Sequence, residues 1–210
     1  MGKGRLSDKP VFIGLAGTLN AGKDALSDVL ESDYGFLHVS TSDMLREIKR
    51  REFGDAKEAL LLRNDPFIND LRKKRGPGFL IEIIHKEWES QKDQHPGGYV
   101  ASGIRAIGEA EAVVDHGGFV VFVDADVGVR HKRAISRRRD ANDEITLEQF
   151  IAMEQSEIDV DPDDRNVQNL GAMKSMANLV IDNNQPSVEE FELHAIHELQ
   201  SYLNSPRKQN

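Results

Sequence analysis

An apolar run that ends in a glycine-rich loop constrains the fold of this chain more than any other feature. Val11 to Ala16 is a short apolar run of the kind found in buried strands, and it leads directly into the loop GTLNAGKD at residues 17–24. Apolar residues then recur at helical spacing from Ala25 to Leu30. A strand that passes through such a loop into a helix indicates the start of a parallel α/β unit.

The loop matches the pattern G-x-x-x-x-G-K. Its glycines let several backbone N–H groups face one point, and the helix that follows adds a field that favours anions. A glycine-rich turn without a ligand would share this pattern, but the strand and helix around it favour phosphate binding. We therefore predict that the loop binds the phosphates of ATP, through Gly17, Asn20, Ala21, Gly22, Lys23, Asp24 and Ala25.

Asp24 stands where the pattern usually has a serine or threonine that binds magnesium. A carboxylate is also a good hard-oxygen ligand for Mg²⁺. Asp24 is therefore a candidate magnesium ligand, directly or through water. The alternative is that it only caps or charges the first turn of the helix.

The rest of the chain alternates between strand and helix patterns, with strands expected at residues 36–39, 99–101, 119–123 and 179–181. Helices are expected at residues 43–51, in pieces over 55–92 with breaks near 64–66 and 76–78, and at 130–139, 145–157 and 188–203. This alternation predicts one domain with a parallel sheet covered on both faces. In such sheets, ligands bind beyond the carboxyl ends of the strands, where the candidate motifs fall.

Composition narrows the classes of function. The net charge is −9, which does not favour binding to nucleic acid or to an anionic membrane. The absence of cysteine excludes thiolate catalysis and cysteine metal sites. Because the N-terminus is polar and no apolar run is long enough for a membrane span, we expect a cytoplasmic protein.

The segment VSTSDMLR at residues 39–46 resembles the acceptor-binding segment of adenylate kinases. These enzymes belong, with other nucleoside monophosphate kinases and dephospho-coenzyme A kinases, to the small-molecule kinases of the P-loop superfamily. In that segment a threonine and an arginine hold the acceptor nucleotide, and Thr41 and Arg46 match them. Ser42 stands where a glycine is usual.

A second segment, Gly103-Ile104-Arg105 followed by Glu109, resembles the region after the third strand of these kinases. The resemblance implies that Gly103 and Arg105 contact the acceptor and that Arg105 grips its phosphate. It also implies that Glu109, which stands where glutamine is usual, faces the acceptor base.

A third segment, VDAD at residues 123–126 followed by Arg130, Arg133 and Arg137, is similar to the fourth strand and lid helix. The lid arginines of the family clamp the phosphoryl group in transfer, and residues 177–184 resemble the last strand and adenine-side loop of dephospho-coenzyme A kinases. The implied fold is a three-layer α/β/α P-loop NTPase fold with a central parallel five-stranded sheet. A helical acceptor-binding insert at residues 43–98 and a short lid region at residues 130–170 would complete it.

Arginine suits this chemistry because phosphoryl transfer mainly requires that two phosphates be aligned and their charge neutralised. Arg133 and Arg137 are four residues apart and so share one helix face. The alternative for this cluster is a solvated basic helix or a nucleic-acid patch.

Two positions, Asp43 and Ser102, bear on which carboxylates take part in the chemistry. Asp43 either orients Arg46 or acts as a general base, which only a hydroxyl acceptor would need. Ser102 stands where related kinases have an aspartate that acts on magnesium, so we hypothesise that this carboxylate has moved to Asp24 in the phosphate loop. The histidines show no convincing metal-ligand spacing, and His38 is interpreted as a core or edge residue.

These features predict an ATP-dependent phosphotransferase that uses Mg²⁺ and a small nucleotide-like acceptor, with neither nucleic acid nor membrane as a partner. The first choice of acceptor is a nucleoside or deoxynucleoside monophosphate, and the alternative is dephospho-coenzyme A. The predicted catalytic residues are Lys23, Asp43, Arg105, Arg133 and Arg137. A rival of another class is a nucleotide-binding regulatory protein without transfer activity. The sequence does not determine the oligomeric state.

Overall fold

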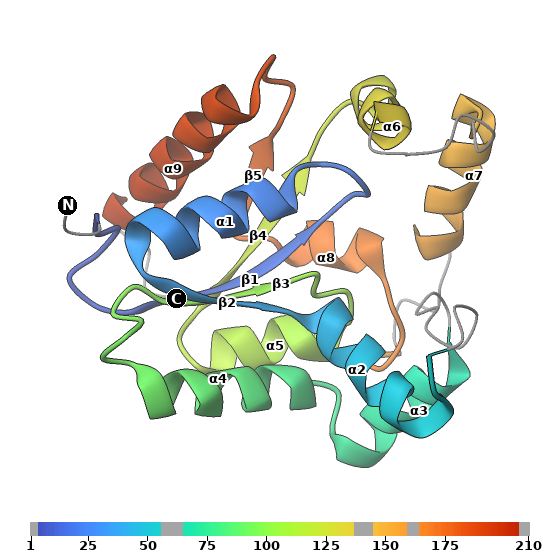
Figure 1. Ribbon diagram of the computed structural model, residues 1–210, viewed down its shortest axis with the longest axis horizontal. Helices are drawn as coiled ribbons and strands as arrows, with labels where there is room; N and C mark the ends of the chain where they lie inside the picture. The colour runs from blue at the N-terminus through green and yellow to red at the C-terminus, as the bar shows by residue number, and fades with distance from the viewer. Residues whose placement is uncertain (1–3, 56–64, 137–144, 159–163, 206–210) are drawn as a thin grey trace.

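A five-stranded, all-parallel sheet with the strand order β2-β3-β1-β4-β5 forms the centre of the molecule (Figure 1). The computed structural model describes residues 4–55, 65–136, 145–158 and 164–205. The strands are β1 (Val11–Gly17), β2 (Phe36–Ser40), β3 (Gly98–Ser102), β4 (Phe119–Asp124) and β5 (Leu179–Asp182). All five strands expected from the sequence are present, and the predicted fold class is confirmed.

The described helices are α1 (Lys23–Tyr34), α2 (Thr41–Phe53), α3 (Pro66–Arg75), α4 (Phe79–Gln91), α5 (Ile107–Asp115), α6 (Val127–Ser136), α7 (Leu147–Ile158), α8 (Leu170–Met176) and α9 (Val188–Asn204). The sequence patterns predicted no helix over α5 or α8. Both are short, with nine and seven residues, so they offer few turns in which a helical period can be recognised. Among the described helices, none has the length and hydropathy that a membrane span requires.

The register of the sheet brings the carboxyl ends of four strands together. Leu15 of β1 pairs with Ser102 of β3, while Gly17 at the end of β1 pairs with Val123 of β4. Ser40 at the end of β2 also pairs with Ser102. The segments that leave β1, β2, β3 and β4 therefore start at one edge of the sheet, where ligands bind in folds of this type.

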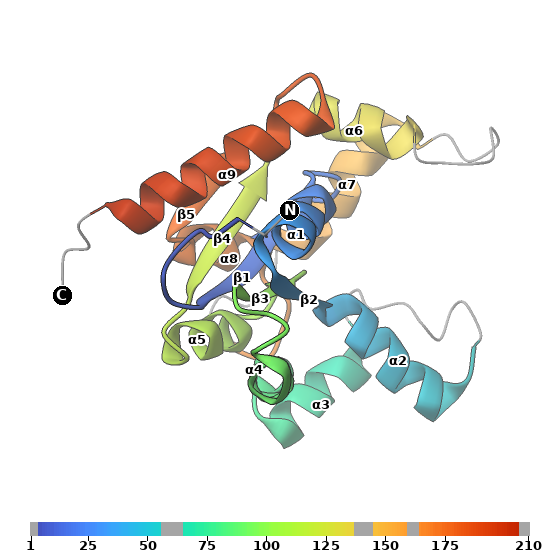
Figure 2. The same cartoon turned by 60° about the vertical axis from the view of Figure 1, so that its left-hand side comes forward.

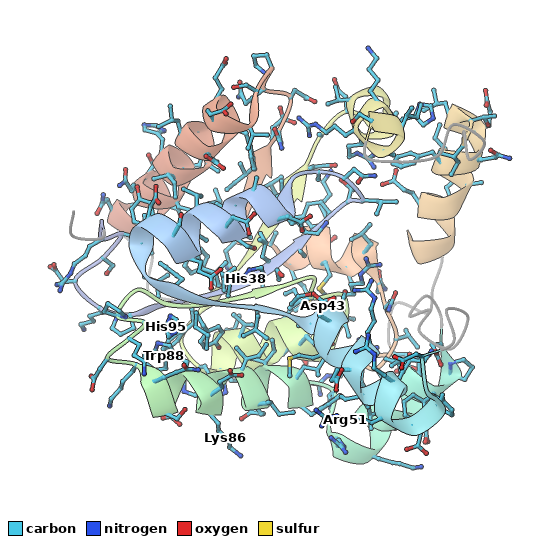
Figure 3. The ribbon with its side chains drawn as sticks, viewed as in Figure 1. His38, Asp43, Arg51, Lys86, Trp88 and His95 are labelled. Atoms are coloured by element: carbon cyan, nitrogen blue, oxygen red, sulfur yellow. The ribbon has the colours of Figure 1, made fainter. Side chains whose placement is uncertain are left out.

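Two helical layers cover the sheet. Helices α1 and α9 lie on one face, where Leu26, Leu30, Phe191 and Leu199 pack against inward-facing strand residues (Figure 1). Helices α4, α5 and α8 cover the other face. Trp88 of α4 belongs to this second core and donates from Nε1 to the His95 carbonyl oxygen at 2.9 Å. Figure 3 shows both residues well away from Asp43, toward the other end of the strands.

Helices α2 and α3 stand together beyond the end of β2 (Figure 2). Leu45, Ile68, Phe79 and Leu80 form a small core of their own there. The remainder of α4 packs on the sheet, through Ile81, Ile84 and Trp88. Among the described residues of the range 43–98 that the sequence assigned to the acceptor insert, this separate core draws on α2, α3 and the first turn of α4.

Local signals explain where α2 and α3 begin. The Ser40 side chain caps α2 by accepting from the Asp43 N–H. Asp65 caps α3 by accepting from the Phe67 N–H, and Pro66 occupies the first turn, where its missing N–H costs no hydrogen bond. The start of α2 is thus fixed directly at the sheet edge.

Candidate active site

The loop between β1 and α1 has the backbone that a phosphate loop needs. Asn20 and Gly22 have φ angles of 58° and 106°, in the left-handed region. A Cβ atom on Gly17 would lie 2.2 Å from the Val123 carbonyl oxygen, and one on Gly22 would lie 2.2 Å from Asn183 Nδ2. Both glycines are therefore required, the first by contact with β4 and the second by contact with the segment after β5.

Lys23 holds its ammonium group against the loop. Its Nζ atom donates to the carbonyl oxygens of Gly17 at 3.0 Å and Thr18 at 2.8 Å. Ala21, which is fully buried, accepts a hydrogen bond from Asn183 Nδ2 at its carbonyl oxygen. The loop is thus fixed from both sides, and its one lysine is positioned where a phosphate would bind.

Asp124, at the end of β4, holds the loop from the other side. Its Oδ1 atom accepts from Thr18 Oγ1 and from the Ala125 N–H, both at 2.9 Å, and its Oδ2 atom pairs with Lys174 Nζ at 2.7 Å. Burial alone would raise the pKa of this carboxyl group, but the hydrogen bonds from Lys174, Thr18 and Ala125 outweigh burial and lower it. Asp124 therefore stays ionised.

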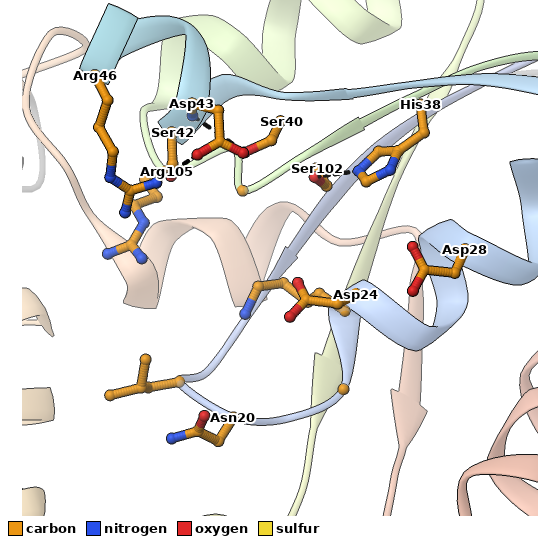
Figure 4. A pocket seen from close by; sticks show the side chains of 14 residues that line it. Asn20, Asp24, Asp28, His38, Ser40, Ser42, Asp43, Arg46, Ser102 and Arg105 are labelled. Carbon is orange, nitrogen blue, oxygen red and sulfur yellow. Dashed lines mark hydrogen bonds and ion pairs between the residues drawn. The ribbon is translucent and has the colours of Figure 1, made fainter. Parts of the chain in front are cut away.

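A cavity of about 490 Å³ opens beside the loop and is lined by residues from three segments of the chain, 19–28, 38–46 and 102–105 (Figure 4). This volume is ample for a small-molecule ligand. Its lining includes nine residues that the sequence singled out, namely Asn20, Gly22, Lys23, Asp24, Asp43, Arg46, Ser102, Gly103 and Arg105. Residues up to 85 positions apart in the chain are thus brought to one space.

Arg46 and Arg105 reach into the same end of this cavity, from α2 and from the segment after β3 (Figure 4). Arg46 Nη1 lies 2.7 Å from Asp43 Oδ1, and both side chains are substantially exposed. This ion pair is the contact that Asp43 would make if it orients Arg46, and its role stays a prediction. This end of the cavity has the cationic groups that an anion requires.

His38 and Asp28 also line the cavity, and the sequence analysis missed both. His38 Nε2 lies 2.8 Å from Ser102 Oγ, so the histidine is a cavity residue and not only an edge residue of the sheet. One signal was available in the sequence, because His38 and Ser40 alternate with apolar Leu37 and Val39 and so share a strand face.

The predicted acceptor contact of Thr41 is not supported by its position. Thr41 is 1% exposed and does not line the cavity. Its hydroxyl group donates to the Ser102 carbonyl oxygen at 3.1 Å. Thr41 thus ties the start of α2 to the end of β3, and it places Arg46 only indirectly.

The prediction that Glu109 faces the acceptor base is wrong, because Glu109 is buried and does not line the cavity. Glu109 and Arg72 of α3 are both 1% exposed, and they form an ion pair with Nη2 and Oε1 2.9 Å apart. The second carboxylate oxygen of Glu109 accepts from the N–H groups of Arg105 and Ala106. Glu109 therefore faces the protein interior, where it caps α5 and compensates the buried charge of Arg72.

The predicted lid arginines separate into different surroundings. Arg130 is buried and forms an ion pair with Glu154 of α7. Arg133 donates from Nη2 to the carbonyl and side-chain oxygens of Asn183, and it lines a second cavity of about 250 Å³ on the α9 side of the loop. Arg137 lies outside the described residues. The described conformation therefore places Arg133 beside the loop and away from Arg46 and Arg105.

The cavity wall between the loop and β3 has oxygen atoms that could bind Mg²⁺. Asp24 and Ser102 both line the first cavity there. In the described ranges, no group of three or more His, Asp or Glu side chains could hold a metal ion by itself. This arrangement fits Mg²⁺ that arrives with nucleotide phosphates, because such an ion needs only one or two protein oxygens.

The sequence matches no protein-family model and no curated protein. Several solved structures share its fold. TT1252 from Thermus thermophilus has a TM-score of 0.57 and 17% identity, covering 94% of this chain and 100% of that chain. An uncharacterized protein from Eubacterium ventriosum has a TM-score of 0.52 and 14% identity, covering 92% and 99%.

A gluconokinase from Sinorhizobium meliloti also matches, with a TM-score of 0.48 and 16% identity over 93% of this chain and 94% of that chain. Similarity at this level says nothing about an acceptor. The strand order, the two helical layers and the loop geometry define the architecture of this chain as a three-layer P-loop NTPase fold.

Proposed function

We propose that the protein is a phosphotransferase that moves the γ-phosphoryl group of ATP to a small nucleotide-like acceptor, first of all a nucleoside or deoxynucleoside monophosphate. One observation carries this proposal: Lys23 of the phosphate loop lines the same cavity as Arg46 and Arg105. A protein that only bound ATP would not need two further arginines at the place where the γ-phosphate ends. Such a group of cations suits two phosphates that must be held in line.

The donor would lie along the loop. The N–H groups of residues 17–24 and Lys23 would bind the phosphates of ATP. The cavity of about 250 Å³ on the α9 side, lined by Arg133, Asn183 and Phe191, would receive the adenine. In this arrangement Arg133 contacts the donor nucleotide, which differs from the clamp on the transferred group that the sequence resemblance implied.

The acceptor phosphate would bind between Arg46 and Arg105. Guanidinium groups bind phosphate oxygens in pairs and keep their charge at every physiological pH. Because α2 and α3 have a small core of their own, we expect them to close over the acceptor when it binds. Mg²⁺, with Asp24 and Ser102 as its protein contacts, would neutralise charge on the donor phosphates.

A hydroxyl acceptor such as that of dephospho-coenzyme A would require a general base. Asp43 was the candidate, but Arg46 holds its carboxylate at 2.7 Å and both groups are exposed. A carboxylate in this position serves to orient the arginine. The geometry therefore supports the monophosphate acceptor over the hydroxyl acceptor.

An assay of ADP formation with Mg-ATP and a panel of nucleoside monophosphates, deoxynucleoside monophosphates and dephospho-coenzyme A tests the proposal. We expect acceptor-stimulated turnover with at least one monophosphate. Arg51→Ala provides a matched control, because Arg51 is on the same helix as Arg46 but pairs with Glu47 outside the cavity (Figure 3). Tight ATP binding without stimulated turnover would instead indicate the regulatory protein.

A further inference from the structure

The two ends of the acceptor cavity differ in charge. Arg46 and Arg105 lie at one end, and Figure 4 shows His38 and Asp28 at the other, with Ser102 between them. Asp24 and Asp28 are four residues apart on α1 and so share the helix face that lines the cavity. The cavity therefore changes from cationic to anionic along its length.

The fold explains this separation. Arg46 and Arg105 follow the carboxyl ends of β2 and β3, so they project beyond the edge of the sheet. His38 precedes the end of β2 by two residues, and Asp28 lies one helical turn further into α1 than Asp24. The His38 and Asp28 end thus lies alongside the strands, and the Arg46 and Arg105 end lies beyond them.

At the His38 and Asp28 end, the Asp28 carboxylate accepts hydrogen bonds, and the His38 ring accepts or donates according to its tautomer. The Asp28 carboxylate is exposed, and it has no hydrogen-bond partner in the described part of the chain. The hydrogen bond between His38 and Ser102 uses Nε2 of the ring, which leaves Nδ1 for a ligand. The Asp28 carboxylate at this end would repel a second negative charge.

We infer that the acceptor carries its phosphate at one end only, and that the opposite end is an uncharged group with hydrogen-bond donors, which Asp28 and His38 recognise. This inference rests on the proposed function and narrows its substrate class. Nucleotides with a free sugar hydroxyl or an amino group at that end would be accepted. Nucleotides with a second phosphate there would be rejected.

The test compares nucleoside 5′-monophosphates with the corresponding nucleoside 3′,5′-bisphosphates as acceptors, for the wild type, Asp28→Asn and His38→Gln. We expect the wild type to prefer the monophosphate. Asp28→Asn should raise KM for the monophosphate about threefold to tenfold, since one charged hydrogen bond is lost. The same variant should also reduce the preference for the monophosphate over the bisphosphate about fivefold, because it removes one negative charge from a solvent-exposed site.

Asp33→Asn on the same helix is the matched control, because Asp33 is exposed and does not line the cavity. The ATP dissociation constant should not change in any of these variants. Dissociation constants of the monophosphate and the bisphosphate, measured by calorimetry, give the preference between the two acceptors without depending on turnover. If Asp28→Asn keeps the wild-type ratio while Arg46→Ala abolishes acceptor binding, the inference is wrong and the proposed function stands. If neither acceptor binds, both are wrong.

Discussion

Thr18 of the phosphate loop and Asp124 of β4 are joined by a hydrogen bond of 2.9 Å between Oγ1 and Oδ1. Thr18 also offers its carbonyl oxygen to the ammonium group of Lys23. Asp124 in turn forms an ion pair with Lys174 of α8. The position of the loop lysine therefore depends on a carboxylate that the sequence analysis did not assign to the site.

Asp124→Asn should destabilise the protein in a pH-dependent way. The pKa of Asp124 is lowered in the folded protein, so the carboxylate contributes stability above its ordinary pKa of 3.8, and this contribution is lost as the pH falls below that value. Because Lys174 is half exposed, we expect a loss of only about 1 kcal/mol at pH 7. Urea unfolding of both proteins at pH 7 and pH 3 measures the difference, which should be smaller at the lower pH.

Glu109→Gln should lower the free energy of unfolding, whatever its effect on catalysis. The substitution leaves the fully buried Arg72 without its counter-ion, and breaking such a pair costs about 3–5 kcal/mol. The double variant Arg72→Met with Glu109→Leu should recover part of that loss, because no unpaired charge remains. Equilibrium unfolding of the wild type, Glu109→Gln and the double variant measures these differences in the free energy of unfolding. A stable Glu109→Gln protein with altered base preference would restore the original prediction for this residue.

Asp24→Asn should increase the magnesium concentration needed for half-maximal turnover. The prediction follows from the position of Asp24 beside Ser102 on one cavity wall. Loss of one hard anionic ligand should weaken the metal without removing ATP binding. Turnover titrated with Mg²⁺, together with Mn²⁺ binding to the ATP complex, measures the effect. An unchanged metal dependence would show that Asp24 serves only the helix.

The protein should lose stability in mild acid because of the partly buried His85. The rings of His85 and His116 stack with centroids 3.8 Å apart, and the pKa of His85 is lowered by burial and by His116. The folded state therefore binds fewer protons than the unfolded state just below the ordinary pKa of 6.5. Stability should fall as the pH drops through that region, by at most about 1.4 kcal/mol per pH unit. Unfolding of wild type and His85→Gln between pH 7.5 and 5.5 tests this, and parallel curves would contradict it.

The sequence alone predicted the sheet and the loop because both depend on local patterns. The run from Val11, the glycines and the spacing to Lys23 are all contained within thirteen residues. The convergence of Arg46 and Arg105 on the loop followed from the strand ends, since parallel strands place their carboxyl ends at one edge.

The interpretations of Glu109, Thr41 and His38 failed for a different reason. Glu109 is buried because Arg72, 37 residues earlier, needs a counter-ion, and nothing near Glu109 in the sequence indicates that partner. The Thr41 hydroxyl group donates to the Ser102 carbonyl oxygen. His38 lies beside the Ser102 hydroxyl group because of the register between β2 and β3. Such pairings depend on how segments pack, which local patterns do not contain.

The central claim is that the cavity beside the loop transfers phosphoryl groups. Its most direct test is transfer of labelled γ-phosphate from ATP to a nucleoside monophosphate by the wild type, Arg46→Ala and the control Arg51→Ala. We predict that the wild type and Arg51→Ala form labelled diphosphate at similar rates. Arg46→Ala should lose at least about 2 kcal/mol of transition-state stabilisation, or about thirtyfold in kcat/KM, with ATP affinity unchanged. Equal rates for Arg46→Ala and the wild type, or no labelled product with any monophosphate, would contradict the account.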